Sequence, residues 1–500
     1  MSNSIKKLAG QTMWYGLSSI AARFINYLLT PYLTFKFTNA QYGEMSIIYA
    51  FIPFMNIVFT YGMETAYFRF INTEKSTKVY STISISVLIS TLLFSLLILV
   101  LHQPLASLLT INEHPNYLFY TLIVIAFDAL TAIPFAKLRQ DNRPIKYAVI
   151  RISSILINIA SIYFFLSICP AWLKENPNHW CSKLYNPDFA VGYVLVANII
   201  QSVITFLLLT KEFFSFKWEF DFPLWKTIML YSMPLIIAGF GGMINETFDR
   251  IMLSWWAPAA NEIAAKAEVG IYAACYKLSI LITLSVQAFR MGAEPFFFKK
   301  ATDSDAQKTY ARVMKFFVIT LCFMFLLVVL YLDIWKHFIR NPKMWQGLKV
   351  VPILLLANMF LGIYYNLSIW YKLGNKTIAG AYITVIGAVV TLTINYFFIP
   401  YFSYMACAWA TFSCYGIMML ISYFWGQKEY PIPYEWKKLS AYIIIVVALF
   451  FVHTFLSHWY NTYWFNLLSA TFLILIFAFI IFIQEKKEWK NFPLLRIWIK

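Results

Sequence analysis

Long apolar stretches follow one another along almost the whole chain, separated by short polar segments. Each stretch is long enough to cross about 30 Å of hydrocarbon as a helix, which rises about 1.5 Å per residue. The pattern predicts fourteen membrane-spanning helices, at residues 12–35, 44–68, 79–101, 117–137, 146–168, 189–210, 226–250, 268–289, 312–333, 348–370, 377–399, 403–425, 439–457 and 463–483. We therefore expect an all-α polytopic membrane protein.

A faint internal repeat lies within these spans. The matched residues are Gly43 with Gly270, Tyr49 with Tyr276, and the run 62–69 with the run 292–299. Two pseudo-symmetric six-helix bundles are expected, at residues 1–210 and 226–425, and an even number of spans relates them by an axis along the membrane normal. Residues 211–225 would form an interfacial cytoplasmic linker, residues 426–484 two additional transmembrane helices, and residues 485–500 a cytoplasmic tail.

Composition and charge agree with this picture. Of 500 residues, 60% are hydrophobic and 13% charged, whereas about a quarter of an ordinary soluble domain is charged. Segments on the side of the N-terminus hold 28 Lys and Arg residues and those on the other side hold 9, which predicts that both termini are cytoplasmic. The segment from Asp333 to Lys349 is an exception, because its four basic residues would face outward. We read no removable signal peptide at the N-terminus.

The formal net charge of +17 is spread over the inner loops. This distribution favours anionic lipid headgroups and anionic substrates as partners, and not nucleic acid. The six cysteines show no metal-ligand spacing, and no glycine-rich phosphate loop is present, so neither a metal nor another cofactor is expected. Cys169 and Cys181 share a predicted outer loop, where an oxidising compartment permits a disulfide. The sequence leaves open whether one forms.

Cationic and polar residues inside the spans are candidates for a substrate cavity. An ionised side chain in mid-membrane costs several kcal/mol unless it meets a partner, water or a polar substrate. The cavity candidates are Arg23, Asn26, Arg151, Asn158, Tyr276 and Lys277. The alternative is that the small polar residues simply hold helices together. Arg151 also lies close enough to its helix end to reach the cytoplasmic headgroups.

Three acidic residues in the spans are candidates for ion coupling: Asp128, Glu246 and Asp249. Asp128 is the one acid near the centre of a span in the first half. It either titrates during transport or forms a structural pair with Arg23 or Arg151. For Glu246 and Asp249, the alternative is a local ion pair or hinge near the outer end of the seventh span.

Glu64 and Glu294 occupy equivalent places in the two repeats, and a base follows each after five residues, at Arg69 and Lys299. One interpretation is a salt-bridge gate at the cytoplasmic mouth. The other is an interfacial charge cluster that only orients the helices.

With these residues in place, the chain resembles the oligosaccharide flippases of bacterial polysaccharide and O-antigen synthesis. These belong to the multidrug, oligosaccharidyl-lipid and polysaccharide exporter superfamily. The resemblance lies in residues 42–49, 62–69, Asp249–Arg250, 269–272 and Pro295. It implies transport of a polyprenyl-diphosphate-linked oligosaccharide to the outer leaflet of the bacterial inner membrane by alternating access, for lipopolysaccharide or other surface polysaccharide synthesis.

The resemblance also implies a cationic cavity, coupling to H+ or Na+, and association with the polysaccharide synthesis machinery. Arg23 and Lys277 fit the cavity, since a diphosphate needs positive donors. Two alternatives stay open. A multidrug or cation antiporter of the same superfamily would have twelve spans and an acidic cavity. A membrane-embedded polymerase or ligase would carry a sizeable outer loop with His, Arg or acidic residues, and the loops here are short, so we expect a transporter and not an enzyme.

Overall fold

The computed structural model describes residues 20–21, 23–71, 74–374, 376–460 and 462–489. The helices of the first part are α2 Thr30–Lys36, α3 Asn39–Thr60, α4 Met63–Phe70, α5 Ser76–Val100, α6 His102–Leu108, α7 Asn116–Gln140, α8 Pro144–Tyr163, η1 Phe164–Ile168, α9 Cys169–Glu175, η2 Trp180–Lys183, η3 Pro187–Phe189, α10 Gly192–Leu208 and α11 Thr210–Phe213. Those of the second part are α12 Phe222–Trp256, α13 Glu262–Lys300, α14 Ala306–Val329, α15 Leu332–Trp335, η4 Lys336–Phe338, η5 Pro342–Val350, α16 Val351–Leu367, α17 Ile369–Leu373, α18 Thr377–Phe402, α19 Tyr404–Glu429, α20 Trp436–Trp459, α21 Tyr463–Gln484 and α22 Lys486–Trp489.

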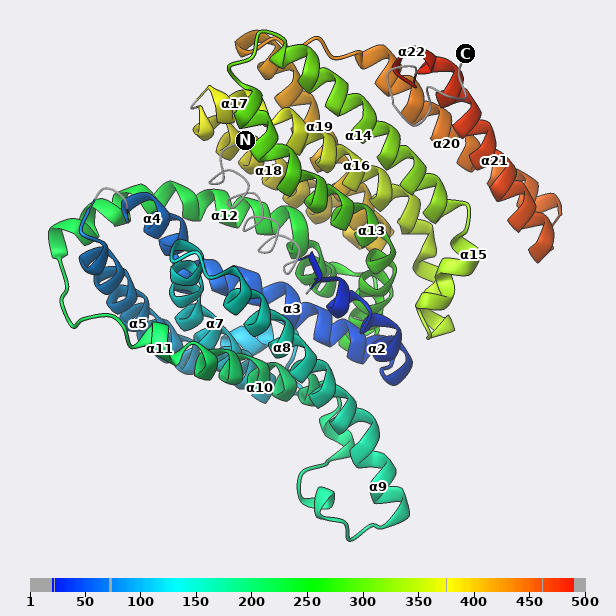
Figure 1. Cartoon of the computed structure of the whole chain (residues 1–500). Helices are drawn as coiled ribbons and strands as arrows, with labels where there is room; N and C mark the ends of the chain where they lie inside the picture. The colour runs from blue at the N-terminus through cyan, green and yellow to red at the C-terminus, as the bar shows by residue number, and fades with distance from the viewer. Residues whose placement is uncertain (1–19, 22, 72–73, 375, 461, 490–500) are drawn as a thin grey trace. The chain divides into compact units, whose positions relative to one another are not determined.

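Within the described residues, every regular element is a helix (Figure 1). This follows from the solvent, because a chain in hydrocarbon must satisfy its backbone hydrogen bonds within each segment. Twelve of the described helices are long and apolar enough to span a membrane, and α10 is a shorter apolar helix. The predicted all-α polytopic class is confirmed, and the protein is a multi-pass membrane protein. Residues 12–19 and 22 of the predicted first span, 12–35, lie outside the described residues. The rest of that span is covered by a helical segment before α2 and by α2 itself.

Contacts divide the chain into two units. The first comprises the described parts of residues 1–277, 339–350 and 377–414, and the second those of residues 278–338, 351–376 and 415–500. The predicted bundles, 1–210 and 226–425, with the linker at 211–225 and the additions at 426–484 and 485–500, therefore stay a prediction. In the first unit, α7 packs against α3, α5 and α10, and α12 packs against α3 and α18.

The start of α3 is set by a capping box. Thr38 accepts a hydrogen bond from the backbone N–H of Gln41, and the Gln41 side chain accepts one from the backbone N–H of Thr38. The box satisfies two backbone donors that the first helical turn leaves free. It starts the helix at Asn39 and so places Gly43 and Glu44 within its first two turns.

Two glycines bring α3 and α13 into backbone contact within the first unit. A Cβ atom added to Gly43 would lie 1.8 Å from the carbonyl oxygen of Lys266, and one added to Gly270 would lie 1.9 Å from that of Asn39. The contact is reciprocal, because Asn39 and Lys266 each precede the glycine of their own helix by four residues. Gly43 and Gly270 are also the residues matched in the internal repeat. The two repeats thus meet through equivalent surfaces.

The two repeats differ after this crossing. In the first, α3 ends at Thr60, and Tyr61 and Gly62 follow with φ angles of 31° and 77° before α4 begins. This left-handed pair turns the chain, and glycine adopts such a conformation at little cost. In the second repeat, α13 runs for 39 residues without a break.

In the second unit, the two C-terminal spans are fixed by a charge cluster around Lys315 of α14. The Lys315 ammonium lies 3.2 Å from Glu435, 3.1 Å from Glu485 and 3.1 Å from Glu488. Glu485 also pairs with Lys438 at 2.6 Å and accepts a hydrogen bond from the Tyr442 hydroxyl at 2.7 Å. Lys315 and Glu485 are both buried. Since a buried charge is costly without a partner, these ion pairs hold α20 and α21 against α14.

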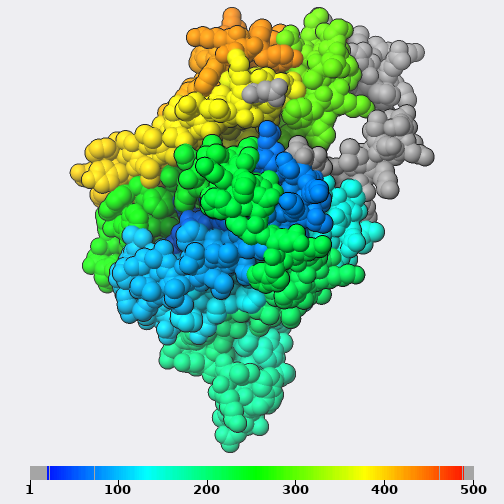
Figure 2. Space-filling model, turned by 90° about the vertical axis from the view of Figure 1, so that its left-hand side faces the viewer, coloured from blue at the N-terminus to red at the C-terminus, as the bar shows by residue number. Residues whose placement is uncertain are grey.

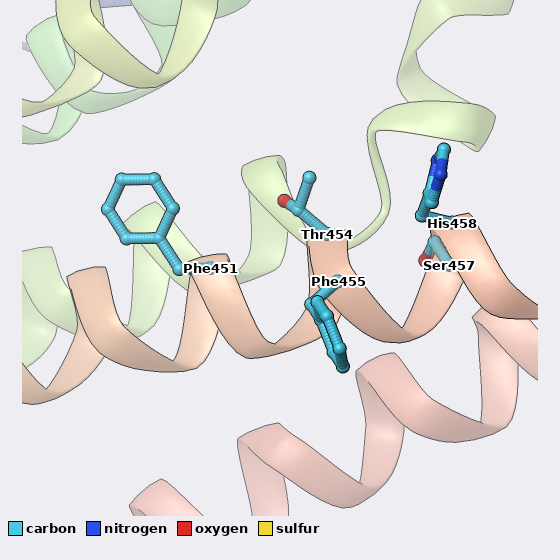
Figure 3. Close-up of a pocket in the computed structure, with 5 residues that line it drawn as sticks. All are labelled: Phe451, Thr454, Phe455, Ser457 and His458. Carbon is cyan, nitrogen blue, oxygen red and sulfur yellow. The ribbon is translucent and has the colours of Figure 1, made fainter.

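A shallow hollow of about 720 Å³ lies on α20 (Figure 3). Phe451, Thr454, Phe455, Ser457 and His458 line it, and all come from this one helix. It lies outside the spans that carry the predicted site residues.

The glycine crossing predicts an asymmetric response to added methyl groups. Gly270→Ala places a Cβ against a backbone carbonyl and should destabilise the protein by about 1–3 kcal/mol, which is the usual effect of overpacking. Gly292→Ala is the matched control, because it lies on the same helix with no atom within 4 Å of its added Cβ. Thermal unfolding in detergent measures both. Equal melting temperatures for the two variants would contradict the contact.

The Lys315 cluster predicts that Lys315 and Glu485 are strongly coupled in their effect on the stability of the protein. Lys315→Met should cost about 3 kcal/mol because it removes a partner of the buried Glu485 carboxylate, and adding Glu485→Gln should recover part of that loss. Unfolding of the two single variants and the double variant measures the coupling. Strictly additive losses would contradict it.

The same cluster should depend on pH. Burial raises the pKa of Glu485, but hydrogen bonds from Lys438, Tyr442 and Lys315 outweigh it and hold this pKa below its usual range. The carboxylate therefore stabilises the fold at neutral pH, and this contribution is lost as the pH falls through the lowered pKa. The difference in melting temperature between the parent protein and Glu485→Gln should shrink on acidification. A difference that stays constant from neutral pH to pH of about 3 would contradict the stabilising role of the ionised group.

Candidate functional site

The predicted cavity residues of the first half take different positions. Arg23 and Asn26 lie in the helical segment before α2, and both side chains are exposed. Arg151 is exposed on α8, with its guanidinium 4.2 Å from the ring centre of Phe135. An exposed cation on an aromatic ring keeps its charge available to a ligand while the ring fixes its direction. Arg23 and Arg151 are therefore both accessible in the first unit.

Asn158 has a different role. It is buried and donates a hydrogen bond to Asn198 at 2.8 Å, and Asn198 donates one to the Tyr49 hydroxyl at 2.8 Å. This chain links α8, α10 and α3. Buried amides joined in this way hold membrane helices together, so the contacts of Asn158 match the helix-contact alternative.

Asp128 lies half-buried on α7, where it accepts a hydrogen bond from the Ser202 hydroxyl of α10 at 2.9 Å. Arg151 belongs to the electrostatic surroundings of this carboxyl group. The sequence offered Arg23 or Arg151 as its partner, and the nearest polar contact is instead a neutral hydroxyl. A carboxylate bonded to a hydroxyl keeps acceptor sites for a proton or a metal cation.

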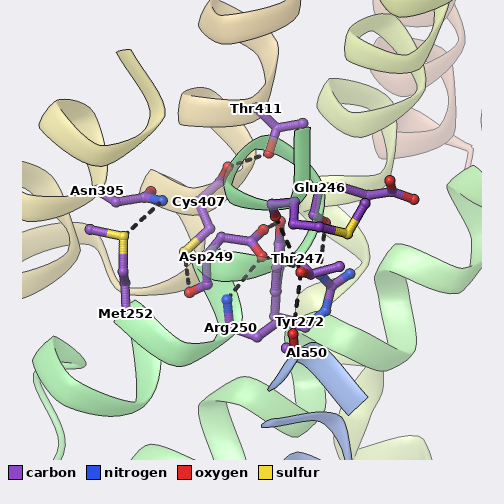
Figure 4. A network of polar contacts seen from close by, with 11 residues as sticks. Ala50, Glu246, Thr247, Asp249, Arg250, Met252, Tyr272, Asn395, Cys407 and Thr411 are labelled. Atoms are coloured by element: carbon purple, nitrogen blue, oxygen red, sulfur yellow. Dashed lines mark hydrogen bonds and ion pairs between the residues drawn. The ribbon is translucent and has the colours of Figure 1, made fainter. Parts of the chain in front are cut away.

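The acids of α12 separate into two kinds (Figure 4). Asp249 is buried and binds Arg250 at 3.1 Å and the Tyr272 hydroxyl at 2.6 Å. Glu246 is exposed, and its backbone carbonyl accepts a hydrogen bond from Arg250. Asp249 is therefore already neutralised by a partner, whereas the Glu246 carboxylate is open.

Arg250 connects this network to the predicted cavity residues on α13. Its guanidinium lies 4.5 Å from the ring centre of Tyr276 and 5.8 Å from that of Tyr272. Tyr276 is buried, and Lys277 beside it is half-buried. From the sequence, Arg250 was named only within the family resemblance and not among the site candidates. Its place at the end of the predicted seventh span, 226–250, was the available signal.

The predicted gate acids make equivalent ion pairs at the predicted inner ends of the spans. Glu64 pairs with Arg139 at the end of α7, and Glu294 pairs with Lys372 of α17 at 2.5 Å. Each base ends the fourth span of its own predicted bundle. Arg69 instead lies over the Tyr231 ring at 5.0 Å, and Lys299 is exposed. The sequence expected bases five residues away, but the contacts run to residues 75 and 78 positions along the chain. Glu294 also pairs with Arg290, four residues before it, at 3.3 Å.

A buried charge cluster at the predicted outer ends of α3 and α13 was missed. The Lys266 ammonium lies 3.5 Å from Glu44, 3.2 Å from Glu262 and 3.9 Å from Glu113. His114 lies 3.2 Å from the same Glu44 carboxylate. Lys266 and Glu44 are 3% and 4% exposed, respectively, so they form a buried pair. Glu44 and Lys266 flank the glycine contact. Their position close to Gly43 and Gly270 in the sequence was the feature that could have revealed the cluster.

The carboxyl groups of Asp128 and Glu246 can bind a proton or a cation. The exposed guanidinium groups of Arg23 and Arg151 can bind an anionic group. Among the described residues, no group of three or more His, Cys, Asp and Glu side chains is placed to hold a metal ion.

Comparison with known sequences identifies the family of this chain. The sequence model of the family described as polysaccharide biosynthesis protein matches residues 8–301, more than half of the chain. The chain belongs to this family.

Two curated relatives come from Haemophilus influenzae. An uncharacterized membrane protein is 22% identical over 290 residues, covering 57% of this chain and 64% of its own length. A protein named for the Lsg locus is 19% identical over 297 residues, covering 59% of this chain and 66% of its own length. The matched part thus spans just under two thirds of each relative.

Solved structures share the fold. The lipid II flippase MurJ in an inward closed conformation matches with a TM-score of 0.71 at 15% identity, covering 94% of this chain and 99% of that one. An inward-facing multidrug resistance transporter of the MATE family, in the MOP superfamily, matches with a TM-score of 0.60 at 12% identity, covering 86% and 95%. An outward-facing one gives 0.56 at 11% identity, covering 87% and 96%. At these identities the likeness concerns the fold alone.

The paired inner ends predict compensation between distant residues. Glu64→Lys and Arg139→Glu each place like charges together and should destabilise the protein, whereas the double variant restores an opposite pair and should recover stability. Glu294→Lys with Lys372→Glu should recover less, because Arg290 also lies 3.3 Å from Glu294. Thermal unfolding in detergent compares each single variant with its double variant. Unchanged melting temperatures in all single variants would leave the pairs without a role in stability.

Proposed function

We propose that this protein is a flippase that moves a polyprenyl-diphosphate-linked oligosaccharide from the cytoplasmic to the outer leaflet by alternating access. Its place is the bacterial inner membrane, with both termini cytoplasmic, and the product serves surface polysaccharide or lipopolysaccharide synthesis. Membership of the polysaccharide biosynthesis protein family carries this proposal. The fold shared with a lipid II flippase supports it, since the two substrates have a lipid-linked, phosphorylated sugar in common.

The diphosphate is bound by cations of the spans. Arg23 and Arg151 are exposed on their helices, and Lys277 is half-buried beside Tyr276. Charge-assisted hydrogen bonds to phosphate oxygens are stronger than neutral ones, and the low dielectric of a membrane cavity increases their attraction. Arg250 is held by Asp249 and lies on Tyr276. Its role is therefore to position the tyrosine next to Lys277.

Asp128 is the proposed coupling residue for H+ or Na+. Its hydrogen bond comes from a hydroxyl and leaves the carboxylate charge uncompensated by a direct ion pair in the described contacts. Asp249 is less suited to coupling because Arg250 and Tyr272 occupy its oxygens. Glu246 remains a second candidate, because its side chain is exposed.

Gating is proposed at the outer ends of α3 and α13. Glu44 belongs to the first predicted bundle and Lys266 to the second, so this pair must separate when the bundles part toward the outer leaflet. Glu64–Arg139 and Glu294–Lys372 each stay within one bundle. We therefore propose that the inner pairs brace their own bundles and that the outer pair, with the Gly43–Gly270 contact, is the gate.

A multidrug or cation antiporter is the second candidate, favoured by the fold shared with MATE transporters. The two differ in cargo charge. A cationic drug would be repelled by Arg23, Arg151 and Lys277, whereas a diphosphate would be attracted.

Reconstitution in liposomes tests the function. Labelled polyprenyl-diphosphate oligosaccharide in the inner leaflet should move to the outer one, faster with an imposed H+ or Na+ gradient. Lys277→Ala and Arg23→Ala should each lower transfer at least about tenfold, the effect of losing one charged hydrogen bond. Lys437→Ala, an exposed cation on α20, should leave it unchanged. Gradient-driven efflux of a cationic dye without lipid transfer would favour the antiporter, and lengthened glycan product would favour a polymerase.

The coupling residue has its own test. Asp128→Asn keeps an oxygen that accepts from Ser202 but removes the charge. Lipid-linked substrate should still bind, and transfer should no longer respond to the gradient. A full response to the gradient in this variant would remove Asp128 from coupling.

Cross-linking tests the gate. With the six native cysteines replaced by serine, Glu44→Cys with Lys266→Cys joined by a short thiol-specific linker should stop transfer, because the linker ties α3 to α13. Glu262→Cys with Lys266→Cys is the control, since that linker lies within α13 one turn apart. Continued transfer by the linked Glu44–Lys266 variant would place the gate elsewhere.

A further inference from the structure

Residues 169–191 form a hairpin that projects beyond the helices α8 and α10 that carry it (Figures 1 and 2). Helix α9 leads out to Glu175, and a turn follows in which Asn176 donates its backbone N–H to Trp172 and His179 donates to Asn176. The chain then returns through η2. The distribution of basic residues predicts that this hairpin lies on the outer side of the membrane.

The turn brings two cysteines together. Cys169 is the first residue of α9 and Cys181 lies in η2. Helix α9 packs against η2, and the Cys181 thiol belongs to the immediate surroundings of the Cys169 thiol. Both are completely buried, at 0% exposure. Twelve positions along the chain separate them, so their contact closes the base of the hairpin.

Aromatic rings cover the returning segment of the hairpin. Trp172 of α9 lies 4.9 Å from His179 and 6.2 Å from Trp180, between ring centres. Trp180 also stacks on Phe164 at 6.2 Å. These contacts act on the residues next to Cys181 and hold its backbone against α9. The proximity of the thiols is therefore built from independent contacts on both sides of the turn.

A segment of this size cannot form a substantial core of its own. Small extracellular segments are commonly stabilised by disulfides for this reason. The buried thiols meet the first geometric condition for a bridge, which is adjacent side chains on backbones that already approach each other.

We propose that Cys169 and Cys181 form a disulfide that closes the outer hairpin. In this step each thiol loses a proton, the two sulfur atoms form one bond, and two electrons pass to the disulfide of a periplasmic thiol oxidase, which leaves as a dithiol. The proposal rests on the outward orientation of the hairpin and not on the identity of the transported substrate.

Thiol counting on the full chain tests the bridge. Membranes from cells grown in air are denatured in acid, free thiols are blocked with N-ethylmaleimide, and the protein is then reduced and labelled with a second maleimide of different mass. Of the six cysteines, four should carry the first label and two the second, and peptide mapping should place the second label on residues 169 and 181.

Variants separate this pair from the other cysteines. Cys181→Ser should leave no cysteine for the second label, because its partner becomes a free thiol. Cys322→Ser, a buried cysteine of α14, should still leave two. First-label modification of all six cysteines in the parent chain, or a second label at any other pair, would overturn the proposal. Transfer of lipid-linked sugar is not needed for this readout, so its outcome is independent of the proposed function.

Discussion

The contact between Gly43 and Gly270 is the constraint on which the rest of the first unit depends. Hydrocarbon is as apolar as a leucine side chain, so membrane helices gain little from burying apolar surface against each other. Close packing of backbones supplies the attraction instead, and only residues without a Cβ permit it here. The same close approach brings Glu44 and Lys266 to within ion-pair distance. The close backbone contact and the ion pair therefore both result from the crossing of α3 and α13.

The ion pairs of the described residues differ in which parts of the structure they join. The Lys315 cluster joins added helices to a unit, the inner pairs join the second and fourth spans within a predicted bundle, and the outer pair joins the two repeats. An ion pair in low dielectric is costly to break when one partner stays behind. Pairs within a bundle therefore resist deformation, whereas a pair between bundles makes one arrangement of the bundles more stable than the other. This distinction fits the alternating access that we propose.

Much of the fold could be predicted from the sequence, because apolar runs report spans directly and the repeat reports equivalent surfaces. Tyr276 and Lys277 could be placed in a span for the same reason. The partners of the charged side chains were harder to predict. Glu64 binds Arg139, a residue 75 positions away, and such a contact depends on the rotation of two helices about their axes, which hydropathy does not specify. Lys266 was missed because the predicted eighth span began at residue 268, whereas α13 begins at Glu262. This shift of the helix start placed a buried cation in an apparent loop.

The unequal inner parts of the repeats have a mechanical meaning. Helix α13 is a continuous rod of 39 residues, about 58 Å long at the helical rise and therefore nearly twice the thickness of the hydrocarbon. Its counterpart α3 ends just before Tyr61 and Gly62, where the backbone turns before α4 begins. A change in a few backbone angles at this turn would reorient α4 against α3. The uninterrupted α13 has no such turn between its two ends.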